Sequence, residues 1–600
     1  MTNTASPLAE GFAQHVARWA ERAGCDAHGV ELARAAAQLV STETQAGHVC
    51  AHIDALPPPW QAMLPDALHT ALLATGVVSD GADEPKPLVA DGKGRLYLWR
   101  YFDYERRLAV ALRSLARPRT ITHAQRAELA RQLDTLFPAD KESKDLDRQK
   151  LAAALALYSG LCVISGGPGT GKTHTVVALL AALLTQEPTA RVALAAPTGK
   201  AAARLMDTLR SRATDLPEAL RERLPSEAST VHRLLGVTSE AGRFLHHRDN
   251  PLPLDTLIVD EASMLDLALA THLVEALPDG ARLILLGDKD QLSAVEAGAV
   301  FAELATGQSF TPACASALAE LLACAPEAVA AAGGAQSPLP DAVVWLTESR
   351  RFRADSGIGR LAADINAGRG EAALEWMQAQ HDNAMHWIDD PQPAPNDTAR
   401  GAMLHGYAAY FEALRNPQTS SDPAALMAAF GRYQILCAVQ AGPRGVVALN
   451  DFIGQHVRRL TASVSANPWH HGRAVMILRN DYALRIFNGD IGICIPNAAG
   501  ELVVAFPDAA AGWRLLTPSR LPEHSDAFAM TVHKSQGSEF ERVHLVLPER
   551  PVAVLTRELV YTAITRATQA VEISGRADVF ISACRNPTQR RSGLGSRLSK

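Results

Sequence analysis

The residues best suited to chemistry form a glycine-rich string that ends in a lysine and a threonine. The string consists of Gly166, Gly167, Pro168, Gly169, Thr170, Gly171, Lys172 and Thr173. It follows an apolar run and precedes a helical pattern that begins near Thr173. In that setting the glycines let backbone N–H groups curl around phosphate oxygens, the lysine reaches the β and γ phosphates, and the threonine ligates Mg²⁺. The string therefore predicts a site for ATP with Mg²⁺, and a chance glycine-rich turn is disfavoured by the context.

Two further polar clusters end apolar runs and supply what such a loop needs. Asp260 and Glu261 follow Leu257–Val259, and we expect Asp260 to hold Mg²⁺ and Glu261 to activate the attacking water. Alone, the pair fits a helix N-cap equally well. Gln291 follows the run ending at Leu286, where it could touch the γ phosphate and the attacking water. The alternative, a polar loop without a ligand, is not excluded by this fragment alone.

The elements that must position these residues are short strands alternating with helices. The expected strands of a first sheet are Leu161–Ile164, Val192–Ala196, Leu257–Val259 and Leu283–Leu286. This alternation is typical of a parallel sheet, whose active edge lies at the strand carboxyl ends. A second series, at Ile435–Val439 and Val543–Leu547, predicts another α/β unit.

The remaining segments predict two smaller parts. Residues 5–114 carry helical periodicity without a phosphate or metal motif, which predicts a helical docking domain. Between the strands of the second series, Val475–Leu478, Ile491–Cys494 and Leu502–Ala505 alternate with turn residues. This pattern predicts a small β-barrel inserted into the second unit.

Composition places limits on the whole chain. Its 600 residues allow several domains, and 47% hydrophobic residues are typical of globular proteins. The eight cysteines include no CxxC pair, so we expect free thiols and a cytoplasmic protein. No apolar run is long enough to span a bilayer, so no membrane partner is expected. The net charge of -6 means that any nucleic acid must bind in a local groove.

Taken in order, the motifs from Gln149 to Ala567 resemble those of a superfamily 1 helicase. The resemblance implies an α/β fold with two RecA-like P-loop lobes, an N-terminal helical domain and a small inserted β-barrel in the second lobe. The expected boundaries are 1–115 for the N-terminal partner-docking domain, 140–345 for the first lobe, 346–600 for the second lobe and about 470–515 for the insertion.

The same resemblance implies roles for further residues. Gln149 would read adenine and Glu539 would face the ribose. The segments at 196–202 and 230–234 resemble those that contact single-stranded DNA, and the segment at 529–540 resembles the one that links the nucleotide state to the grip on the strand. The resemblance assigns DNA contacts to Pro197, Thr198, His232, Thr531 and His533. Arg351 and Arg566 lie in segments resembling those that place arginines against the γ phosphate from across the cleft. Arg350 is adjacent to Arg351, so the choice between the two stays open.

Within the superfamily, three segments resemble the RecD-type alpha subunit of exodeoxyribonuclease V. They are Leu96–Tyr101 with Glu105 and Arg106, Gly357–Ala362 and Ile486–Gly492. This resemblance implies an ATP-dependent 5′–3′ DNA helicase in a heterotrimer with RecB-like and RecC-like subunits, acting on single-stranded tails and duplex ends in double-strand break repair by homologous recombination. The nuclease would belong to a partner.

Several alternatives stay open at this point. The chain could be a stand-alone superfamily 1 DNA or RNA helicase, or a non-catalytic subunit whose ATP site only signals occupancy. Intact Glu261, Gln291 and Arg566 disfavour the last, since a signalling site needs no complete hydrolytic set. Residues 238–250 lie where helicases of this type carry a strand-separating pin, and they form either that pin or an ordinary loop.

Overall fold

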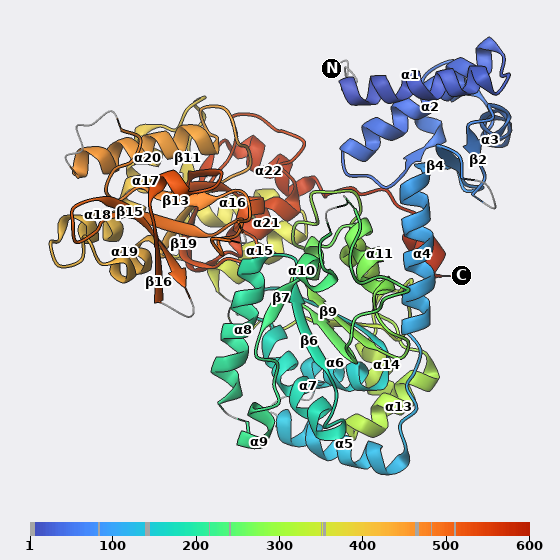
Figure 1. Cartoon of the computed structure of the whole chain (residues 1–600), viewed down its shortest axis with the longest axis horizontal. Coiled ribbons are helices and arrows are strands. Elements are labelled where there is room, and N and C mark those ends of the chain that lie inside the picture. Colours follow the sequence, from blue (N-terminus) through green and yellow to red (C-terminus); the bar gives the residue numbers. More distant parts are fainter. Residues whose placement is uncertain are drawn as a thin grey trace.

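The computed structural model describes residues 6–81, 85–138, 145–214, 216–238, 240, 242–349, 351, 356–461, 467–481, 483–508 and 512–599. The chain forms an N-terminal unit, a first lobe and a second lobe, which are blue, cyan to green, and yellow to red in Figure 1. Among the described residues, no single helix has the length and apolar composition needed to cross a membrane, and only a helix pair bent by 113° meets both conditions together.

The N-terminal unit combines helices with a small sheet. Its helices are α1 (Pro7–Arg22), α2 (Ala27–Gln45) and α3 (Pro65–Ala74). The expected helices are thus present, and four short strands accompany them in the order β1 (Ala51–His52), β4 (Arg95–Leu98), β3 (Leu88–Ala90) and β2 (Val78–Ser79). Strands of two to four residues are too short to show an alternating pattern, so no pattern in the sequence predicted this sheet.

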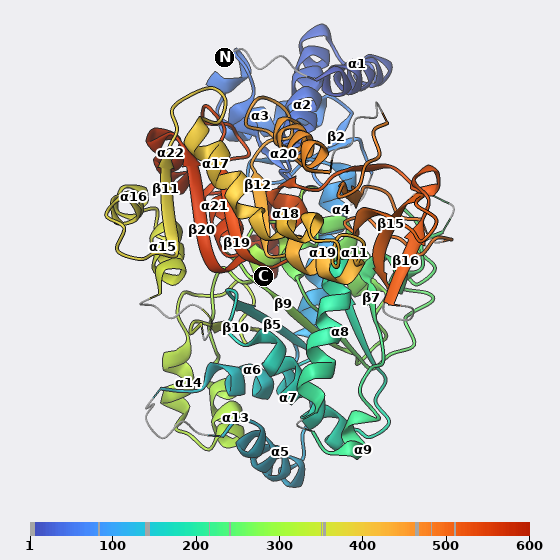
Figure 2. The same cartoon turned by 90° about the vertical axis from the view of Figure 1, so that its left-hand side faces the viewer.

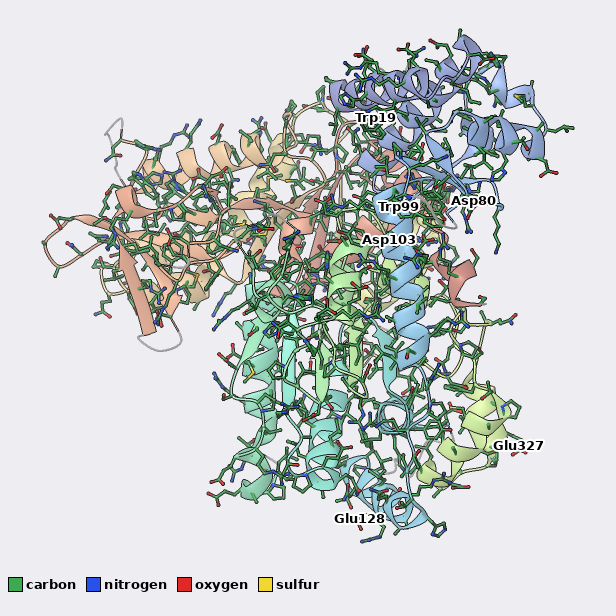
Figure 3. All side chains as sticks on the ribbon, turned by 45° about the vertical axis from the view of Figure 1, so that its right-hand side comes forward. Trp19, Asp80, Trp99, Asp103, Glu128 and Glu327 are labelled. Carbon is green, nitrogen blue, oxygen red and sulfur yellow. The ribbon has the colours of Figure 1, made fainter. Side chains whose placement is uncertain are left out.

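Helix α4 (Trp99–Leu115) leaves the N-terminal unit and runs along the first lobe. Figure 3 labels Trp99 and Asp103 near the start of this helix, below the N-terminal unit. Its buried Leu108 and Leu112 belong to the same hydrophobic cluster as the first-lobe strands. Although the expected boundary near 115 assigns α4 to the N-terminal domain, its apolar face packs in the first lobe.

The first lobe is built on a six-stranded sheet whose pairs are all parallel. The strands, in spatial order, are β10 (Val343–Leu346), β5 (Leu161–Gly166), β9 (Arg282–Gly287), β8 (Thr256–Val259), β6 (Val192–Ala196) and β7 (Ala228–Thr230). Successive side chains point to opposite faces of a strand. In β5, Leu161 and Val163 therefore join one hydrophobic cluster, whereas Cys162 and Ile164 join another on the opposite face.

Helices cover both faces of this sheet. They are α5 (His123–Leu136), α6 (Arg148–Tyr158), α7 (Lys172–Gln186), α8 (Gly199–Ala213), α9 (Glu218–Arg221), α10 (Val231–Leu235), α11 (Leu267–Glu275), α12 (Val300–Leu304), α13 (Pro312–Leu322) and α14 (Pro326–Ala332). Because strands buried on both faces read as continuous apolar runs, the sequence predicted β5, β6, β8 and β9 within one or two residues.

The second lobe repeats the arrangement with a five-stranded parallel sheet. Its order is β11 (Met385–Asp389), β20 (Ala567–Gly575), β19 (Phe540–Val546), β12 (Tyr433–Cys437) and β18 (Ala529–Thr531). Its helices are α15 (Gly357–Asn366), α16 (Gly370–Gln378), α17 (Asp397–Gly406), α18 (Ala408–Arg415), α19 (Pro423–Phe430), α20 (Val446–Leu460), α21 (Arg557–Ile564) and α22 (Ala577–Arg585). The predicted pair of α/β lobes is therefore present.

A five-stranded antiparallel sheet interrupts the second lobe. Its order is β16 (Gly512–Leu516), β15 (Leu502–Asp508), β14 (Ile491–Pro496), β13 (Ala474–Ile477) and β17 (His524–Asp526). Figure 2 shows β15 and β16 standing apart from the parallel strands β12, β19 and β20. The small β-barrel expected near 470–515 is, among the described residues, an open sheet with β16 and β17 at its two edges, and it extends to Asp526.

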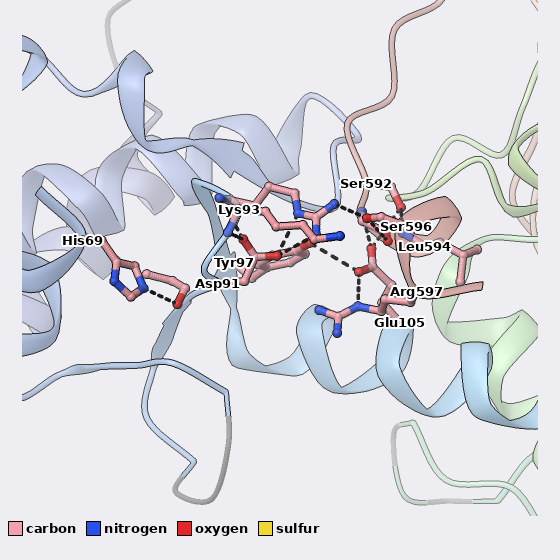
Figure 4. A network of polar contacts seen from close by, with 12 residues as sticks. His69, Asp91, Lys93, Tyr97, Glu105, Ser592, Leu594, Ser596 and Arg597 are labelled. Carbon is pink, nitrogen blue, oxygen red and sulfur yellow. Dashed lines mark hydrogen bonds and ion pairs between the residues drawn. The ribbon is translucent and has the colours of Figure 1, made fainter. Parts of the chain in front are cut away.

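The C-terminal segment, residues 586–599, returns from α22 to the N-terminal unit and α4 (Figure 1). Figure 4 shows its polar anchor, the fully buried carboxylate of Glu105 on α4. This carboxylate accepts hydrogen bonds from the Gly593 N–H at 2.7 Å, the Ser592 hydroxyl at 2.9 Å and Arg597 Nε at 2.6 Å. Leu594 and Leu598 of helix α23 (Leu594–Leu598) enter the first-lobe cluster. The end of the chain thus ties the second lobe to the other two parts.

Candidate nucleotide site and DNA-facing segments

The glycine-rich loop connects the buried strand β5 to the first turn of α7. Gly169 and Gly171 adopt positive φ angles of 79° and 86°, which favour glycine. Space is restricted as well, because a Cβ atom on Gly169 would collide with the Cβ of Arg351. The Lys172 ammonium turns into the loop and donates to the carbonyls of Gly166 and Gly167, the latter at 3.3 Å. The loop therefore presents the amino end of α7, with its positive potential, to the cleft.

Asp260 and Glu261 follow β8 at the same edge of the sheet. The backbone N–H of Glu261 donates to Asp260 Oδ1 at 2.9 Å, and Glu261 has a φ of 53°. Burial and the neighbouring Glu261 carboxylate raise the pKa of Asp260 to about 6, although Lys172 acts in the opposite direction. Two carboxyls and a lysine thus lie together, as a metal-assisted phosphate site requires.

Gln291 lies in the loop after β9, where contacts from the second lobe reach it. Its Nε2 donates to Asp288 Oδ2 at 3.0 Å, and the same carboxylate oxygen accepts from the Tyr561 hydroxyl at 3.1 Å. The next residue, Leu292, donates its N–H to Thr562 Oγ1 at 2.9 Å and accepts from Gln536 Nε2 at 2.9 Å. The loop after β9 therefore joins the two lobes directly behind the cleft.

Two arginines approach the cleft from the far side. Arg566 is 2% exposed, and burial lowers its pKa. Its Nε donates to the Thr562 carbonyl at 3.3 Å and its Nη1 to the Ser538 carbonyl at 3.4 Å. Arg351 forms an ion pair with Glu539, close to the glycine-rich loop. Arg350, the alternative to Arg351, lies outside the described residues.

These groups surround one cleft with a volume of about 370 Å³. Its lining includes Lys172, Glu261, Gln291, Arg351 and Arg566, which are all five candidate catalytic residues, together with the candidate metal ligands Thr173 and Asp260. Of the candidate nucleotide-binding residues, Gly167, Pro168, Gly169, Thr170, Gly171 and Glu539 also line it. A volume in this range is typical of small-molecule sites.

Gln149 and Gly166 lie just outside this lining. Gln149 supports the loop, because its Nε2 donates to the Thr170 carbonyl at 2.9 Å and its Oε1 contacts His174 Nδ1 at 3.1 Å. Gly166 ends β5 beneath the loop. Their roles toward a nucleotide stay predictions.

The candidate DNA contacts lie at the carboxyl ends of strands at, or next to, one side of the sheet in each lobe. Pro197 and Thr198 follow β6, and His232 follows the neighbouring parallel strand β7. Thr198 caps α8 by accepting from the Ala201 N–H at 3.2 Å, while His232 is exposed. In the second lobe, Thr531 ends β18, and burial lowers the pKa of the nearby His533. The structure thus brings Pro197, Thr198 and His232 to one edge, and Thr531 and His533 to an edge of the other sheet.

Two small antiparallel bridges involve the described part of the candidate pin at 238–250, one of them to the preceding residue Val237. Val237 pairs with Phe244, and His247 pairs with Asn250 in a tight turn. Residues 239 and 241 lie outside the described residues. The bridges make the segment a folded loop, and its role in separating strands stays a prediction.

Three residues of the cleft region escaped the sequence reasoning. Arg204, on α8, lines the cleft and forms an ion pair with Glu539 from across it. Asp288 and Tyr561 link the loop after β9 to the second lobe. Asp288 and Tyr561 lie within motifs that the sequence analysis had already identified. For Arg204 the sequence offered one indication only, its position six residues after Thr198, the residue that caps the same helix.

Three family models match the chain. Residues 4–97 match the N-terminal domain of the RecBCD enzyme subunit RecD, residues 149–297 match an AAA domain, and residues 526–573 match a UvrD-like helicase C-terminal domain. The matched ranges correspond to the N-terminal unit, the first lobe and the part of the second lobe that follows the β insertion.

Curated relatives cover most of the chain. The RecBCD enzyme subunit RecD of Haemophilus influenzae is 36% identical over 533 residues, which is 84% of this chain and 80% of that protein. The subunit of the same name from Mycobacterium tuberculosis is 37% identical over 514 residues, with the same coverage. The ATP-dependent RecD2 DNA helicase of Deinococcus radiodurans is 31% identical, covering 85% of this chain and 59% of that protein.

A solved structure of Bacteroides Pif1 bound to single-stranded DNA aligns at 15% identity and a TM-score of 0.36, covering 78% of this chain and 95% of that chain. The assignment of the family rests on the RecD relatives and on the match of the N-terminal domain. The cleft agrees with it, because its lining includes residues of the motifs that resemble those of helicases. The chain belongs to the RecD family of RecBCD enzyme subunits.

Proposed function

We propose that this protein is an ATP-dependent DNA helicase, the motor subunit of a RecBCD-type exodeoxyribonuclease V. The observation that carries the proposal is the cleft between the lobes, because Lys172, Glu261 and Gln291 of the first lobe face Arg566 of the second. A cleft lined by both lobes supports a clamp in which nucleotide draws the lobes together and hydrolysis releases them. Alternating closure then moves DNA stepwise between the DNA-facing edges.

The residues of the cleft fit ATP and Mg²⁺. Gln291 lines the cleft, and its Oε1 is buried without a hydrogen-bond partner among the described residues, which leaves one acceptor beside the cleft for a ligand. Thr173 and Asp260 supply the oxygen ligands that Mg²⁺ prefers, and they would hold it. When bound, Mg²⁺ would neutralise part of the phosphate charge.

The remaining steps are assigned to residues of the chain. Lys172 would leave the loop carbonyls and pair with the β and γ phosphates, while Glu261 takes a proton from the attacking water. Gln291 orients that water through its free carbonyl oxygen. Arg566, and Arg351 or its neighbour Arg350, would stabilise the charge that develops on the γ phosphate. Gln149 beside the loop would read adenine, and Glu539 would bind the ribose.

The assembly follows from the family. The RecBCD name of the relatives supports a heterotrimer with RecB-like and RecC-like subunits that acts on DNA ends in double-strand break repair. We propose that the N-terminal unit, which carries no candidate chemistry, docks a partner, and that the nuclease resides in another subunit. Eight free cysteines, six of them buried, support a reducing, cytoplasmic location.

The decisive variant is Lys172→Gln, which keeps a polar side chain, one atom shorter, but removes the charge that the phosphates require. We expect ATP hydrolysis and unwinding to be lost, with an unchanged circular dichroism spectrum and melting temperature. Lys93→Gln is the matched control, because Lys93 is an exposed lysine of the N-terminal unit. Near-normal hydrolysis by a folded Lys172→Gln protein would rule out the motor.

The same assay separates the rival functions. DNA should stimulate hydrolysis by the wild-type chain far more than RNA of the same sequence. Equal stimulation by RNA would favour an RNA helicase, and nucleotide binding without hydrolysis in the assembled complex would favour a regulatory subunit.

A further inference from the structure

Helix α8 places an arginine beside the candidate phosphate site from the first-lobe side. Residues 201, 204, 205, 208 and 212 of this helix line the cleft, as expected for one face of a helix with 3.6 residues per turn. Among them, Arg204 is the residue that reaches across the cleft to Glu539 of the second lobe. Arg210 lies on another face, where it donates to the Ser226 carbonyl at 3.2 Å.

A single carboxylate oxygen holds two guanidinium groups at this point. Arg204 Nη2 and Arg351 Nη1 both contact Oε1 of Glu539. Burial raises the pKa of Glu539, but the two arginines outweigh that effect and hold it below its ordinary value. Two cations that share one acceptor oxygen repel each other, so an additional anion in the cleft would draw at least one of them away.

The surroundings of Arg204 indicate which end of a nucleotide it would meet. Its charge acts on Asp260, the candidate metal ligand, and on Arg566, the candidate arginine finger. Both groups belong to the phosphate end of the proposed site, whereas Gln149 lies on the adenine side. The guanidinium of Arg204 also has the planar set of N–H donors that suits phosphate oxygens.

We propose that Arg204 is a further phosphate-binding residue, which leaves Glu539 and contacts the terminal phosphate of bound ATP from the first-lobe side. The proposal rests on the proposed function of the same cleft. In this arrangement Glu539 holds Arg204 in place before nucleotide binds, and the ribose hydroxyls then take over the carboxylate. Arg204 thereby makes the site selective for a triphosphate over a diphosphate.

The test compares two nucleotides on the full-length chain. Binding of the non-hydrolysable analogue β,γ-imido-ATP and of ADP, both with Mg²⁺, is measured by calorimetry for the wild type, Arg204→Gln and the matched control Arg210→Gln. A charge-assisted contact contributes about 1.5–3 kcal/mol, so Arg204→Gln should weaken the triphosphate analogue by roughly 10-fold or more and ADP by less than about 2-fold. Arg210→Gln should change neither.

An arginine that only tied the lobes together through Glu539 would give a different result. Its loss would change the affinities for both nucleotides by the same factor, which would overturn the proposal. Glu539→Gln serves as a second variant: because the ribose is common to both ligands, it should shift both affinities together and leave the selectivity unchanged. If the wild type bound neither nucleotide, the proposed function itself would fail. That outcome differs from one in which the wild type binds both nucleotides and Arg204→Gln weakens both by the same factor, which would overturn only the role of Arg204.

Discussion

Arg566 is almost completely buried, yet it lines a cleft in which charge would develop during hydrolysis. Its side chain is held by the Thr562 and Ser538 carbonyls, so its position is fixed before nucleotide binds. We expect Arg566→Ala to lower kcat by about 10³ or more, as for arginines that stabilise phosphoryl transfer, with a smaller effect on ATP affinity. Steady-state kinetics together with nucleotide binding would measure both.

The conservative variant Arg566→Lys separates charge from geometry. A lysine keeps the positive charge but lacks the planar fork, so most of the loss in kcat should persist. A change confined to ATP affinity in both variants would make Arg566 a binding residue only.

Asp260 gives the cleft a pH dependence that can be measured without activity. Burial, followed by the Glu261 carboxylate, raises its pKa to about 6 from an ordinary value of 3.8. A carboxyl with a raised pKa in the folded state lowers stability as pH rises from about 3.8 through about 6, because ionisation is then harder in the folded protein. Asp260→Asn removes that cost, so the variant should melt at a higher temperature than the wild type at pH 7.5 and at the same temperature near pH 4.

The measurement is thermal unfolding without nucleotide or metal. An effect of about 1 kcal/mol would correspond to roughly 2–4 °C in a lobe of this size. Asp249→Asn is the control, since the Asp249 side chain is 91% exposed and should show no such pH-dependent difference. A wild type that melts higher than Asp260→Asn at pH 7.5 would contradict the prediction.

Among the elements, helix α23 depends most directly on one ion pair. Arg597 meets the fully buried Glu105 carboxylate, and its guanidinium lies 4.4 Å from the centre of the Phe102 ring. Arg597→Met leaves that carboxylate without its cation, although Gly593 and Ser592 still donate to it. We expect a loss of about 1–3 kcal/mol, expressed as faster hydrogen exchange in α23 and along α4.

The control for this variant is Arg585→Met, because Arg585 pairs with Glu371 at an exposed site where an ion pair contributes little. Equal exchange protection of α23 in Arg597→Met and the wild type would show that the ion pair does not hold the helix.

The elements also show how far the sequence alone could lead. Strands buried on both faces, such as β5 and β9, were predictable because their apolar runs end in polar motifs. The short strands β2, β3 and β7 lacked that signal. The contact between Arg204 and Glu539 was out of reach for another reason: each residue belongs to a separate lobe, and no local pattern specifies how two independently folded sheets face each other.

At the scale of the whole molecule, the prediction concerns the direction of movement. The form of the segment around Thr531 and His533, together with the inserted sheet β13–β17, resembles the branch that moves 5′ to 3′. We therefore expect the chain, alone or in its complex, to unwind a partial duplex with a 5′ single-stranded tail. Opposite tails should be compared at one salt concentration, because phosphate contacts make DNA affinity strongly salt-dependent.

Preferential unwinding of the 3′-tailed substrate by the isolated chain would overturn this polarity. The assignment of ATPase activity would still stand. The direction depends on which lobe grips DNA in the ATP state.

Besides the hydrogen bonds of the loop after β9, the returning C-terminal segment gives the second lobe two connections along the chain to the rest of the protein. One is the chain between β10 and α15, and the other is the stretch after α22, where Arg590 donates to the Ala46 carbonyl at 2.9 Å and to the Ala294 carbonyl at 3.2 Å. A rigid domain that is connected at two points rotates most easily about the line that joins those points. We therefore expect the second lobe to rotate about one axis, so that opening of the cleft and displacement of its DNA-facing edge are two results of one rotation.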